Sequence, residues 1–398
     1  MSRQDQMELV SSLPAPQKPS VDVLIIAGEH SGDEQAARML RSFLDINVDA
    51  NVAALGGSEL KKAGADMIFD MMPYAIIGFA EALKRYSEFK ALRDAIVKWI
   101  IEYNPKVVCF VDYPGLNLRI AETLHATKVS SKSGGSIRLA YYISPQVWVW
   151  KAGRRFKMAR FLDGLGVIFP FEVDSFSDTD LDAKFVGHPF LGKDYELPIV
   201  YDQEGDVLLL PGSREGPISR IAPVMFSALE LLLERKDELR AKCIYSSDTN
   251  RELLSDLLEK RPALAGRVEL VSNSEKTRAS CVLTSSGTMS LNCALAGVPG
   301  AIVYRIHPLT FLLGKMLVRV PYIGIANILL DRALYPEYVQ GEARPEALRE
   351  ELLDCLENPD RLSKAQEGSE ALREILDQPA GGGASNWLQS FIGDALQS

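Results

Sequence analysis

Residues 23–33 read VLIIAGEHSGD, an apolar run that leads into a turn bracketed by two glycines. The run predicts a buried parallel strand, and residues 34–44 favour a helix. Open α/β sheets bind ligands beyond the carboxyl ends of their strands, so this turn is a candidate ligand site. It matches neither the G-x-G-x-x-G nor the Walker pattern, so it predicts neither a dinucleotide nor a nucleoside triphosphate. Glu29 precedes the turn, and Asp33 is most simply a first-turn helix acid, so for this pair alone a structural role is favoured.

The rest of the chain repeats this strand–helix alternation in two blocks. Apolar strands alternating with helices predict parallel sheets covered on both faces. A segment rich in Gly and Pro, residues 187–205, has the composition of a linker. The predicted fold class is therefore α/β, with two doubly wound Rossmann-like domains facing a cleft and helices at the C-terminus. The expected divisions are a disordered lead-in (1–20), an N-terminal domain (21–190), a C-terminal domain (200–345) and a helical tail (346–398).

The expected strands of the first block are 22–27, 51–55, 106–111, 137–143, 164–168 and 184–186, and those of the second are 206–210, 240–245, 267–271, 280–284 and 300–304.

Composition narrows the function classes. The net charge of −9 argues against broad nucleic-acid binding. The five cysteines show no C-x-x-C spacing, which favours reduced, buried thiols and a cytoplasmic protein over a disulfide framework or a zinc site. The first twenty residues hold no signal-peptide core, and no uninterrupted apolar run approaches the length of a membrane span. The cysteines are Cys109, Cys243, Cys281, Cys293 and Cys355.

Two strand ends of the second block suit an anion. The first carries Pro211-Gly212-Ser213-Arg214, where backbone N–H groups, a hydroxyl and a guanidinium meet. The second carries Ser286-Gly287-Thr288 at an expected helix start. A plain turn with a solvated arginine, and N-capping by a hydroxyl, are the structural alternatives. Two such ends in one domain favour a nucleoside diphosphate.

The first block offers a carboxylate and an aromatic, cationic segment. Asp112 follows a buried strand, where a general base and a capping residue are equally consistent with the sequence. Trp148 and Trp150 precede a basic run, which suits an amphiphile with an anionic head or a membrane surface. Core tryptophans beside a solvated helix face are the alternative. The cations are Lys151, Arg154, Arg155, Lys157 and Arg160.

These motifs together resemble the lipid-A-disaccharide synthase family, glycosyltransferases with the GT-B fold. The resemblance spans roughly residues 21–375. Besides the segments quoted above, it rests on residues 69–71, 77–81, 112–117, 142–150, 169–172, 185–189, 304–305, 308–310, 320–322, 327–329 and 336–340.

The resemblance implies an inverting reaction that joins UDP-2,3-diacylglucosamine to 2,3-diacylglucosamine 1-phosphate through a β-1,6 linkage and releases UDP. It implies no metal and no cofactor, and it places the enzyme on the cytoplasmic face of the inner membrane, with no nucleic-acid partner; a homodimer stays open. Catalytic positions are Asp112, the preferred base, and Glu29. UDP-binding positions are Arg214, Ser213, Ser286, Gly287, Thr288, Asn292 and Asn327, and acceptor or lipid-side positions are Ser31, Asp33, Ile77, Trp148, Trp150, Arg154 and Arg155.

The sequence departs from the family pattern at two positions. Gly115 stands where the family has a second Asp, and Asn292 stands where it has a Glu suited to the ribose hydroxyls. Asn292 has one carbonyl acceptor and a donating amide, so it cannot accept hydrogen bonds as a carboxylate does. The alternative functions are a related GT-B enzyme on another UDP-sugar, such as a UDP-N-acetylglucosamine epimerase, and a non-catalytic UDP-sugar- or lipid-binding paralogue.

Overall fold

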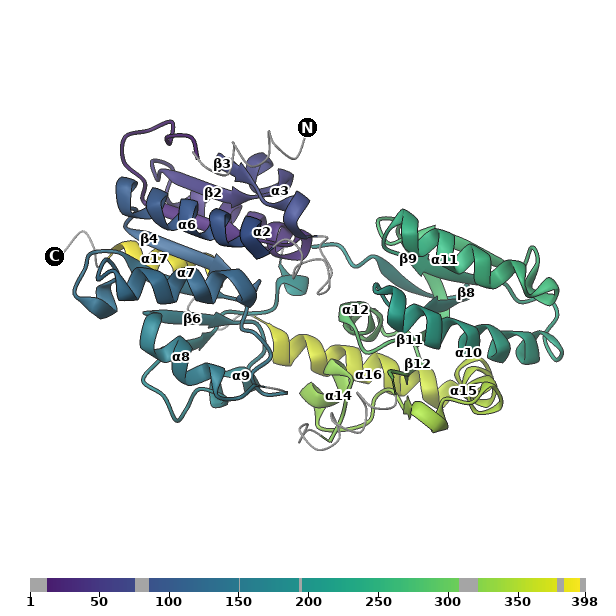
Figure 1. Cartoon of the computed structure of the whole chain (residues 1–398). Coiled ribbons are helices and arrows are strands. Elements are labelled where there is room, and N and C mark those ends of the chain that lie inside the picture. The colour runs from purple at the N-terminus through teal and green to yellow at the C-terminus, as the bar shows by residue number, and fades with distance from the viewer. Residues whose placement is uncertain are drawn as a thin grey trace. The chain divides into compact units, whose positions relative to one another are not determined.

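The computed structural model describes residues 13–75, 86–149, 151–192, 195–307, 321–377 and 383–393. The chain divides into two compact units (Figure 1). The first unit comprises the chain up to residue 194 together with the residues from 376 onward, and the second comprises residues 195–375.

The first unit is a parallel sheet with helices on both faces (Figure 1). Its strand order is β3-β2-β1-β4-β5-β6-β7. The strands are β1 (Val23–Ala27), β2 (Val52–Gly56), β3 (Asp66–Asp70), β4 (Val107–Val111), β5 (Arg138–Tyr142), β6 (Gly164–Val167) and β7 (Ala183–Phe185). The helices are α2 (His30–Ile46), α3 (Ser58–Lys62), α4 (Met72–Ala75), α6 (Tyr86–Tyr103), α7 (Pro114–Ala126), α8 (Arg154–Phe161), α9 (Phe171–Asp174) and α17 (Ala384–Gly393), with 3-10 turns at Ser131–Ser133 and Pro189–Leu191.

Strand β1 lies between β2 and β4 in the interior of this sheet and is buried throughout. Successive side chains of a strand point to opposite faces. Leu24 and Ile26 accordingly join the core cluster that contains residues of α6 and α7, whereas Ile25 joins the one that contains residues of α2 and α17. A continuous apolar strand is thus explained by burial on both faces, as the sequence predicts.

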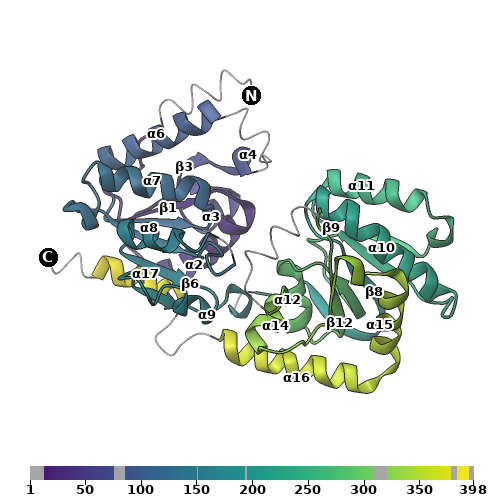
Figure 2. The ribbon, with the colours of Figure 1, turned by 60° about the horizontal axis from the view of Figure 1, so that its bottom comes forward.

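The second unit repeats this architecture around a sheet of order β10-β9-β8-β11-β12-β13. Figure 2 shows α15 and α16 against it. The strands are β8 (Ile199–Leu210), β9 (Ala241–Tyr245), β10 (Val268–Ser272), β11 (Thr277–Thr284), β12 (Gly300–Tyr304) and β13 (Glu337–Val339). The helices are α10 (Glu215–Leu233), α11 (Asp248–Glu259), α12 (Thr288–Leu295), α14 (Ile325–Leu330), α15 (Pro345–Glu357) and α16 (Pro359–Leu376), with 3-10 turns at Pro262–Leu264 and Gln340–Glu342.

Within the described ranges, α10 is the one helix long and apolar enough to cross a membrane. Half of that stretch is buried inside the structure. Its apolar residues, among them Phe226 and Leu229, belong to the core cluster of the second unit. Burial within the core therefore accounts for the apolar composition of α10.

Two edge strands were absent from the sequence prediction. Strand β3 begins and ends with an aspartate, and Ile68 is its one buried residue. Strand β13 has three half-buried residues. Short edge strands with charged ends lack the apolar run by which the other strands are recognised.

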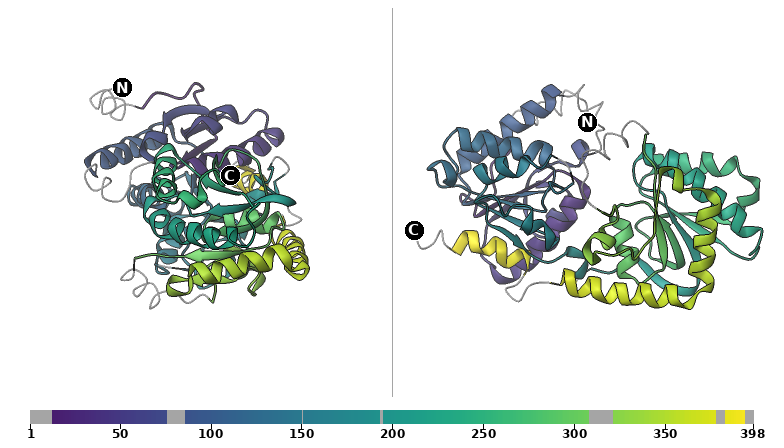
Figure 3. Two further views of the ribbon diagram at one scale, coloured as in Figure 1. Left: turned by 90° about the vertical axis from the view of Figure 1, so that its right-hand side faces the viewer. Right: turned by 90° about the horizontal axis from the view of Figure 1, so that it is seen from below.

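The C-terminal helix α17 packs on the first unit, beside α2 (Figure 3). Its buried Trp387 and Phe391 lie over two glycines of β6. A Cβ atom would come within 2.6 Å of the Phe391 ring at Gly164 and within 3.2 Å of the Trp387 ring at Gly166. The glycines therefore allow α17 to approach the sheet, so the predicted helical tail is shared: α15 and most of α16 belong to the second unit and α17 to the first.

Candidate functional site

Glu29 and Asp112 follow neighbouring strands of the first unit. The last residues of β1 and β4, Ala27 and Val111, are partners in the sheet register. Glu29 is exposed and occupies the N-cap position of α2 without a side-chain capping bond, whereas Asp112 is partly buried. Burial raises the pKa of Asp112 to about 6, and the charge of Glu29 adds to the rise. The two predicted catalytic carboxylates therefore lie in one electrostatic environment.

The backbone at Asp112 adopts a conformation that is rare for residues other than glycine. Asp112 and Tyr113 have φ angles of 44° and 48°, and Ile143 at the end of β5 has 66°. Such left-handed residues cost about 1–3 kcal/mol each and cluster at functional sites. Proline at position 114 then starts α7, where its fixed φ suits the first helical turn.

Tyr113 covers the glycine of the first turn. A Cβ atom at Gly28 would lie 2.1 Å from Cδ1 of the Tyr113 ring, so this position requires glycine. Burial raises the pKa of the Tyr113 hydroxyl, and the charge of Glu29 raises it further. A phenol thus lies beside the two carboxylates, although the sequence analysis did not single it out.

Glu172 is a further carboxylate that the sequence analysis quoted only as part of a matching segment. It is 2% exposed and lies in the short helix α9. Burial raises the pKa of Glu172 to about 8, and the charge of Asp112 adds to the rise. The Phe169 N–H donates to Oε2 of Glu172 at 3.2 Å and opposes the rise. Glu172 therefore keeps its proton to higher pH than an ordinary glutamate does.

Trp148 packs inside the first unit. Its ring makes an edge-to-face contact with Phe171 at 5.0 Å and 85°. The indole nitrogen is buried, and it makes no hydrogen bond to any part of the chain that the structure describes. It does lie near enough to Glu172 to favour the ionised carboxylate. Trp148 as a whole is half-buried, so part of the side chain is exposed.

Asp33 and Ser31, two other predicted acceptor or lipid-side residues, lie in different environments. Asp33 is buried, and its carboxylate accepts the N–H groups of Gly57 at 2.7 Å and Glu59 at 2.9 Å, which caps α3. Ser31 is exposed in the first turn of α2. Ile77 and Trp150 lie outside the described residues.

Helix α8 carries four of the five predicted cations, and Lys151 lies before it. Arg155 binds Asp178 through two hydrogen bonds of 2.7 and 2.5 Å. Arg154 starts the helix and is partly buried. Phe156 is 51% exposed and lies under the guanidinium of Arg155, 4.3 Å from its centre. Phe156 is therefore an exposed aromatic residue among the cations of this surface.

In the second unit, the two anion-suited turns lie side by side. Leu210 and Thr284, the last residues of β8 and β11, are register partners, and the Ser285 N–H donates to the Leu210 carbonyl at 2.8 Å. Gly212 has a φ of 115°, and a Cβ atom there would lie 3.4 Å from the Ser285 hydroxyl. The sequence predicted each turn, and the sheet brings them together.

Each turn opens a helix whose N-terminus has no side-chain cap. Arg214 and Gly287 are the N-cap residues of α10 and α12; a guanidinium cannot accept a capping hydrogen bond and glycine has no side chain, so neither residue caps its helix. Ser213 and Arg214 are exposed, and the Asn250 amide fixes the Ser213 carbonyl at 2.9 Å. Two helix starts and a guanidinium provide donors for an anion.

Asn292 and Asn327 are engaged within the fold. The carbonyl of Asn292 accepts the Tyr195 hydroxyl at 2.7 Å, and the residue is 2% exposed. Asn327 is fully buried; its amide donates to the Tyr335 carbonyl and to Glu337, and its own carbonyl accepts the Tyr335 N–H. Both amide donors of Asn327 are therefore used within the fold, and its role in UDP binding stays a prediction.

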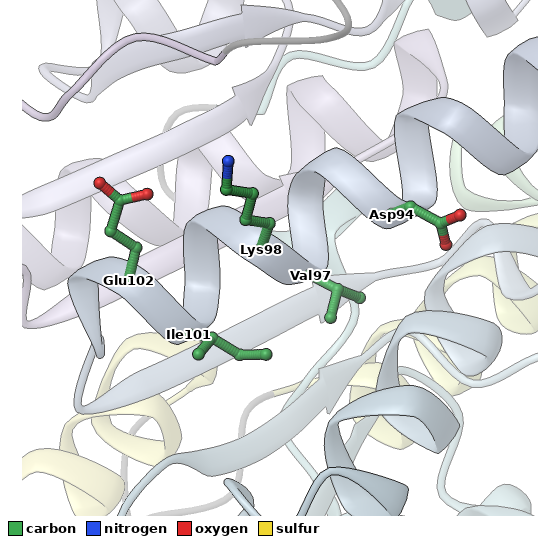
Figure 4. A pocket seen from close by; sticks show the side chains of 5 residues that line it. All are labelled: Asp94, Val97, Lys98, Ile101 and Glu102. Atoms are coloured by element: carbon green, nitrogen blue, oxygen red, sulfur yellow. The ribbon is translucent and has the colours of Figure 1, made fainter.

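A surface hollow of about 380 Å³ lies along α6 (Figure 4). Its lining residues all come from this one helix and include none of the predicted site residues. It is therefore separate from the strand ends described above. The lining consists of Asp94, Val97, Lys98, Ile101 and Glu102.

Comparison with known proteins agrees with the fold and the motifs. A family model described as lipid-A-disaccharide synthetase matches residues 23–382. The lipid-A-disaccharide synthase of Geobacter metallireducens is 31% identical over 395 residues, covering 95% of this chain and 98% of that protein. The synthase of Neisseria meningitidis serogroup C is 32% identical over 379 residues, covering 90% and 94%.

Solved structures with low sequence identity share the architecture. A putative UDP-N-acetylglucosamine 2-epimerase from Listeria monocytogenes has a TM-score of 0.64 at 13% identity, covering 95% of this chain and 97% of that one. The glycosyltransferase of kitacinnamycin has a TM-score of 0.56 at 12% identity, covering 94% and 99%. These likenesses establish the GT-B fold alone. The family match over most of the chain goes further: this protein belongs to the lipid-A-disaccharide synthetase family and is a glycosyltransferase.

Proposed function

We propose that this glycosyltransferase moves the sugar of UDP-2,3-diacylglucosamine to the 6-hydroxyl of 2,3-diacylglucosamine 1-phosphate and releases UDP. The observation that carries the proposal is Asp112, a partly buried carboxylate at a strand end whose pKa of about 6 leaves it ionised at neutral pH. A general base needs a pKa just below the working pH. Asp112 takes the proton of the 6-hydroxyl, and the oxygen then displaces UDP with inversion at the anomeric carbon.

The second unit holds the UDP. The guanidinium of Arg214 and the N–H groups that open α10 and α12 bind the diphosphate and stabilise it as it leaves. Ser213 and residues 286–288 belong to the same pair of turns. Asn292 and Asn327 support this site from within the fold, by fixing Tyr195 and the segment before β13.

The test is product formation by the purified protein from the two lipid substrates. We expect UDP and a β-1,6-linked disaccharide in equal amounts, and no UDP from the donor alone. Epimerisation of the donor sugar at carbon 2 without an acceptor would favour the epimerase alternative. Binding of the donor without either reaction would favour a non-catalytic paralogue.

The rate is expected to depend on pH through Asp112. Its pKa is raised to about 6, so kcat should fall as the pH decreases through this value and the base becomes protonated. Glu29→Gln removes a charge that raises this pKa, so it should move the acid limb of the profile to lower pH. A rate–pH profile of both proteins checks this; a flat profile from neutral pH down to the usual range of aspartate would contradict it.

We further propose that the protein reaches its lipid substrates at the cytoplasmic face of the inner membrane, through α8. Lys157 and Arg160 are exposed there beside the exposed Phe156. Exposing an acyl chain to water is unfavourable by about 0.8 kcal/mol per methylene. Docking at the bilayer therefore lowers the free energy needed to reach the lipid substrates. Each cation adds about 1 kcal/mol of attraction to an anionic surface.

Flotation with vesicles that contain anionic phospholipid tests this surface. We expect binding that weakens with salt, and a loss of roughly tenfold or more in Lys157→Gln/Arg160→Gln, since two cations contribute about 2 kcal/mol. The matched control is Lys61→Gln/Lys62→Gln, which removes two exposed cations from α3. Equal flotation of the two double variants would show that α8 is a solvated face.

A further inference from the structure

Three hydrogen bonds hold the backbone of Asp112 on both sides. Its N–H donates to the Tyr142 carbonyl at 3.0 Å. Its own carbonyl accepts the Tyr141 hydroxyl at 2.5 Å and the Asn117 amide at 2.7 Å. This set of bonds maintains a left-handed φ of 44° that an aspartate rarely adopts.

We infer that Tyr141 and Asn117 are positioning residues for the reaction: by fixing the peptide carbonyl of Asp112, they direct its carboxylate. The inference rests on the proposed role of Asp112 as the base. From the sequence alone, Asn117 belongs only to the matching segment 112–117, and Tyr141 belongs to none. Both act through the backbone of Asp112, so their effect is on the geometry of the base.

Asn117 carries a buried acceptor that has no hydrogen-bond partner among the described residues. The residue is fully buried, and the acceptor is its Oδ1. A buried unpaired acceptor is destabilising, and an apolar side chain would avoid it. Its amide nitrogen also lies 3.3 Å from the Val111 carbonyl and 3.5 Å from the Ile26 carbonyl, so it ties the ends of β1 and β4 to Asp112. The hydrogen bonds that the amide donates therefore explain an asparagine at position 117 better than packing does.

The Tyr141 hydroxyl is likewise explained by its hydrogen bond to Asp112, and Tyr141→Phe removes that hydroxyl alone. Its side chain is fully buried in β5, and its ring lies 6.2 Å from that of Phe110. Phenylalanine would fill the same space, so the hydroxyl is required only for the bond to Asp112. The charged groups that act on this hydroxyl are Asp112, Arg154 and Glu29, and the charge of Asp112 also acts on Glu172. None of these carboxylates can donate a bond to the carbonyl when it is ionised.

The test is Tyr141→Phe in the full-length protein. Loss of the fixed geometry should lower kcat roughly tenfold to a hundredfold, with KM for both substrates unchanged. The acid limb of the rate profile should move to lower pH, because a looser turn admits water to the carboxylate. The matched control is Ser369→Ala, which removes a buried hydroxyl that donates to the Leu295 carbonyl at 2.7 Å in the second unit. It should lose a similar amount of thermal stability and keep the acid limb of the parent protein.

An acid limb and kcat equal to those of the parent in Tyr141→Phe would overturn the inference, since the hydroxyl would then be structural only. Asn117→Ala removes the other donor to the Asp112 carbonyl. It should give the same fall in kcat and the same shift of the acid limb to lower pH. Asp112→Asn separates the two proposals. If Asp112→Asn is inactive and both positioning variants are unchanged, only the inference fails; an active Asp112→Asn overturns the base itself.

Discussion

Asp112→Asn is expected to lower kcat by about 10²–10⁴-fold, the usual contribution of a general base. The amide preserves the shape of the side chain but cannot accept the proton of the 6-hydroxyl. Steady-state rates of UDP release with both lipid substrates measure the loss. UDP affinity, measured by calorimetry, should stay unchanged because the proposed UDP site lies in the other unit.

The same variant should fold at least as stably as the parent protein at neutral pH. Burial raises the pKa of Asp112, so the folded state disfavours its ionised form. The contribution of Asp112 to the free energy of unfolding falls as the pH rises from the ordinary aspartate pKa to about 6. An amide at this position avoids that loss. The control is Asp182→Asn at an exposed position before β7, which should retain full activity. Parent-like turnover in Asp112→Asn would move the role of base to Glu29.

Arg214→Ala is expected to weaken UDP binding roughly tenfold to a hundredfold. A hydrogen bond to a charged group contributes about 1.5–3 kcal/mol, and the guanidinium presents two parallel donors to a diphosphate. Arg214 is exposed at the N-cap of α10, so its removal leaves no cavity. Titration calorimetry with UDP measures the change directly.

Arg220→Ala is the matched control for this experiment. Arg220 is exposed on the same helix, and its guanidinium donates to the Gly216 carbonyl at 2.6 Å. It removes the same charge a short distance along α10. Equal losses in the two variants would mean that UDP responds to the overall charge of the helix, and an unchanged affinity in Arg214→Ala would make residues 211–214 a structural turn.

The strand ends of the site follow from the sequence because they depend on local patterns. The apolar runs before Glu29 and Asp112 predict two buried parallel strands, and parallel strands end at the same edge of a sheet. The same reasoning predicts the turns around Arg214 and Gly287. Their direct adjacency required the strand order, in which β8 lies next to β11.

The side-chain partners did not follow, because they join residues that are distant in the chain. Asp33 caps a helix that begins at residue 58, and Asn292 pairs with Tyr195 across 97 positions. Asn327 uses both of its amide donors with Tyr335 and Glu337. A polar residue in a motif has the same sequence signature whether it meets a ligand or another part of the fold. Burial decides between them only after the chain is folded.

The central claim is that Asp112 activates the 6-hydroxyl of the acceptor, and an acceptor with hydrogen in place of that hydroxyl tests it most directly. With the 6-deoxy acceptor the account predicts competitive inhibition of the normal reaction, no disaccharide and no release of UDP above the rate with donor alone. Release of UDP at the normal rate with the 6-deoxy acceptor would show that another hydroxyl or water is the nucleophile, and would contradict the account.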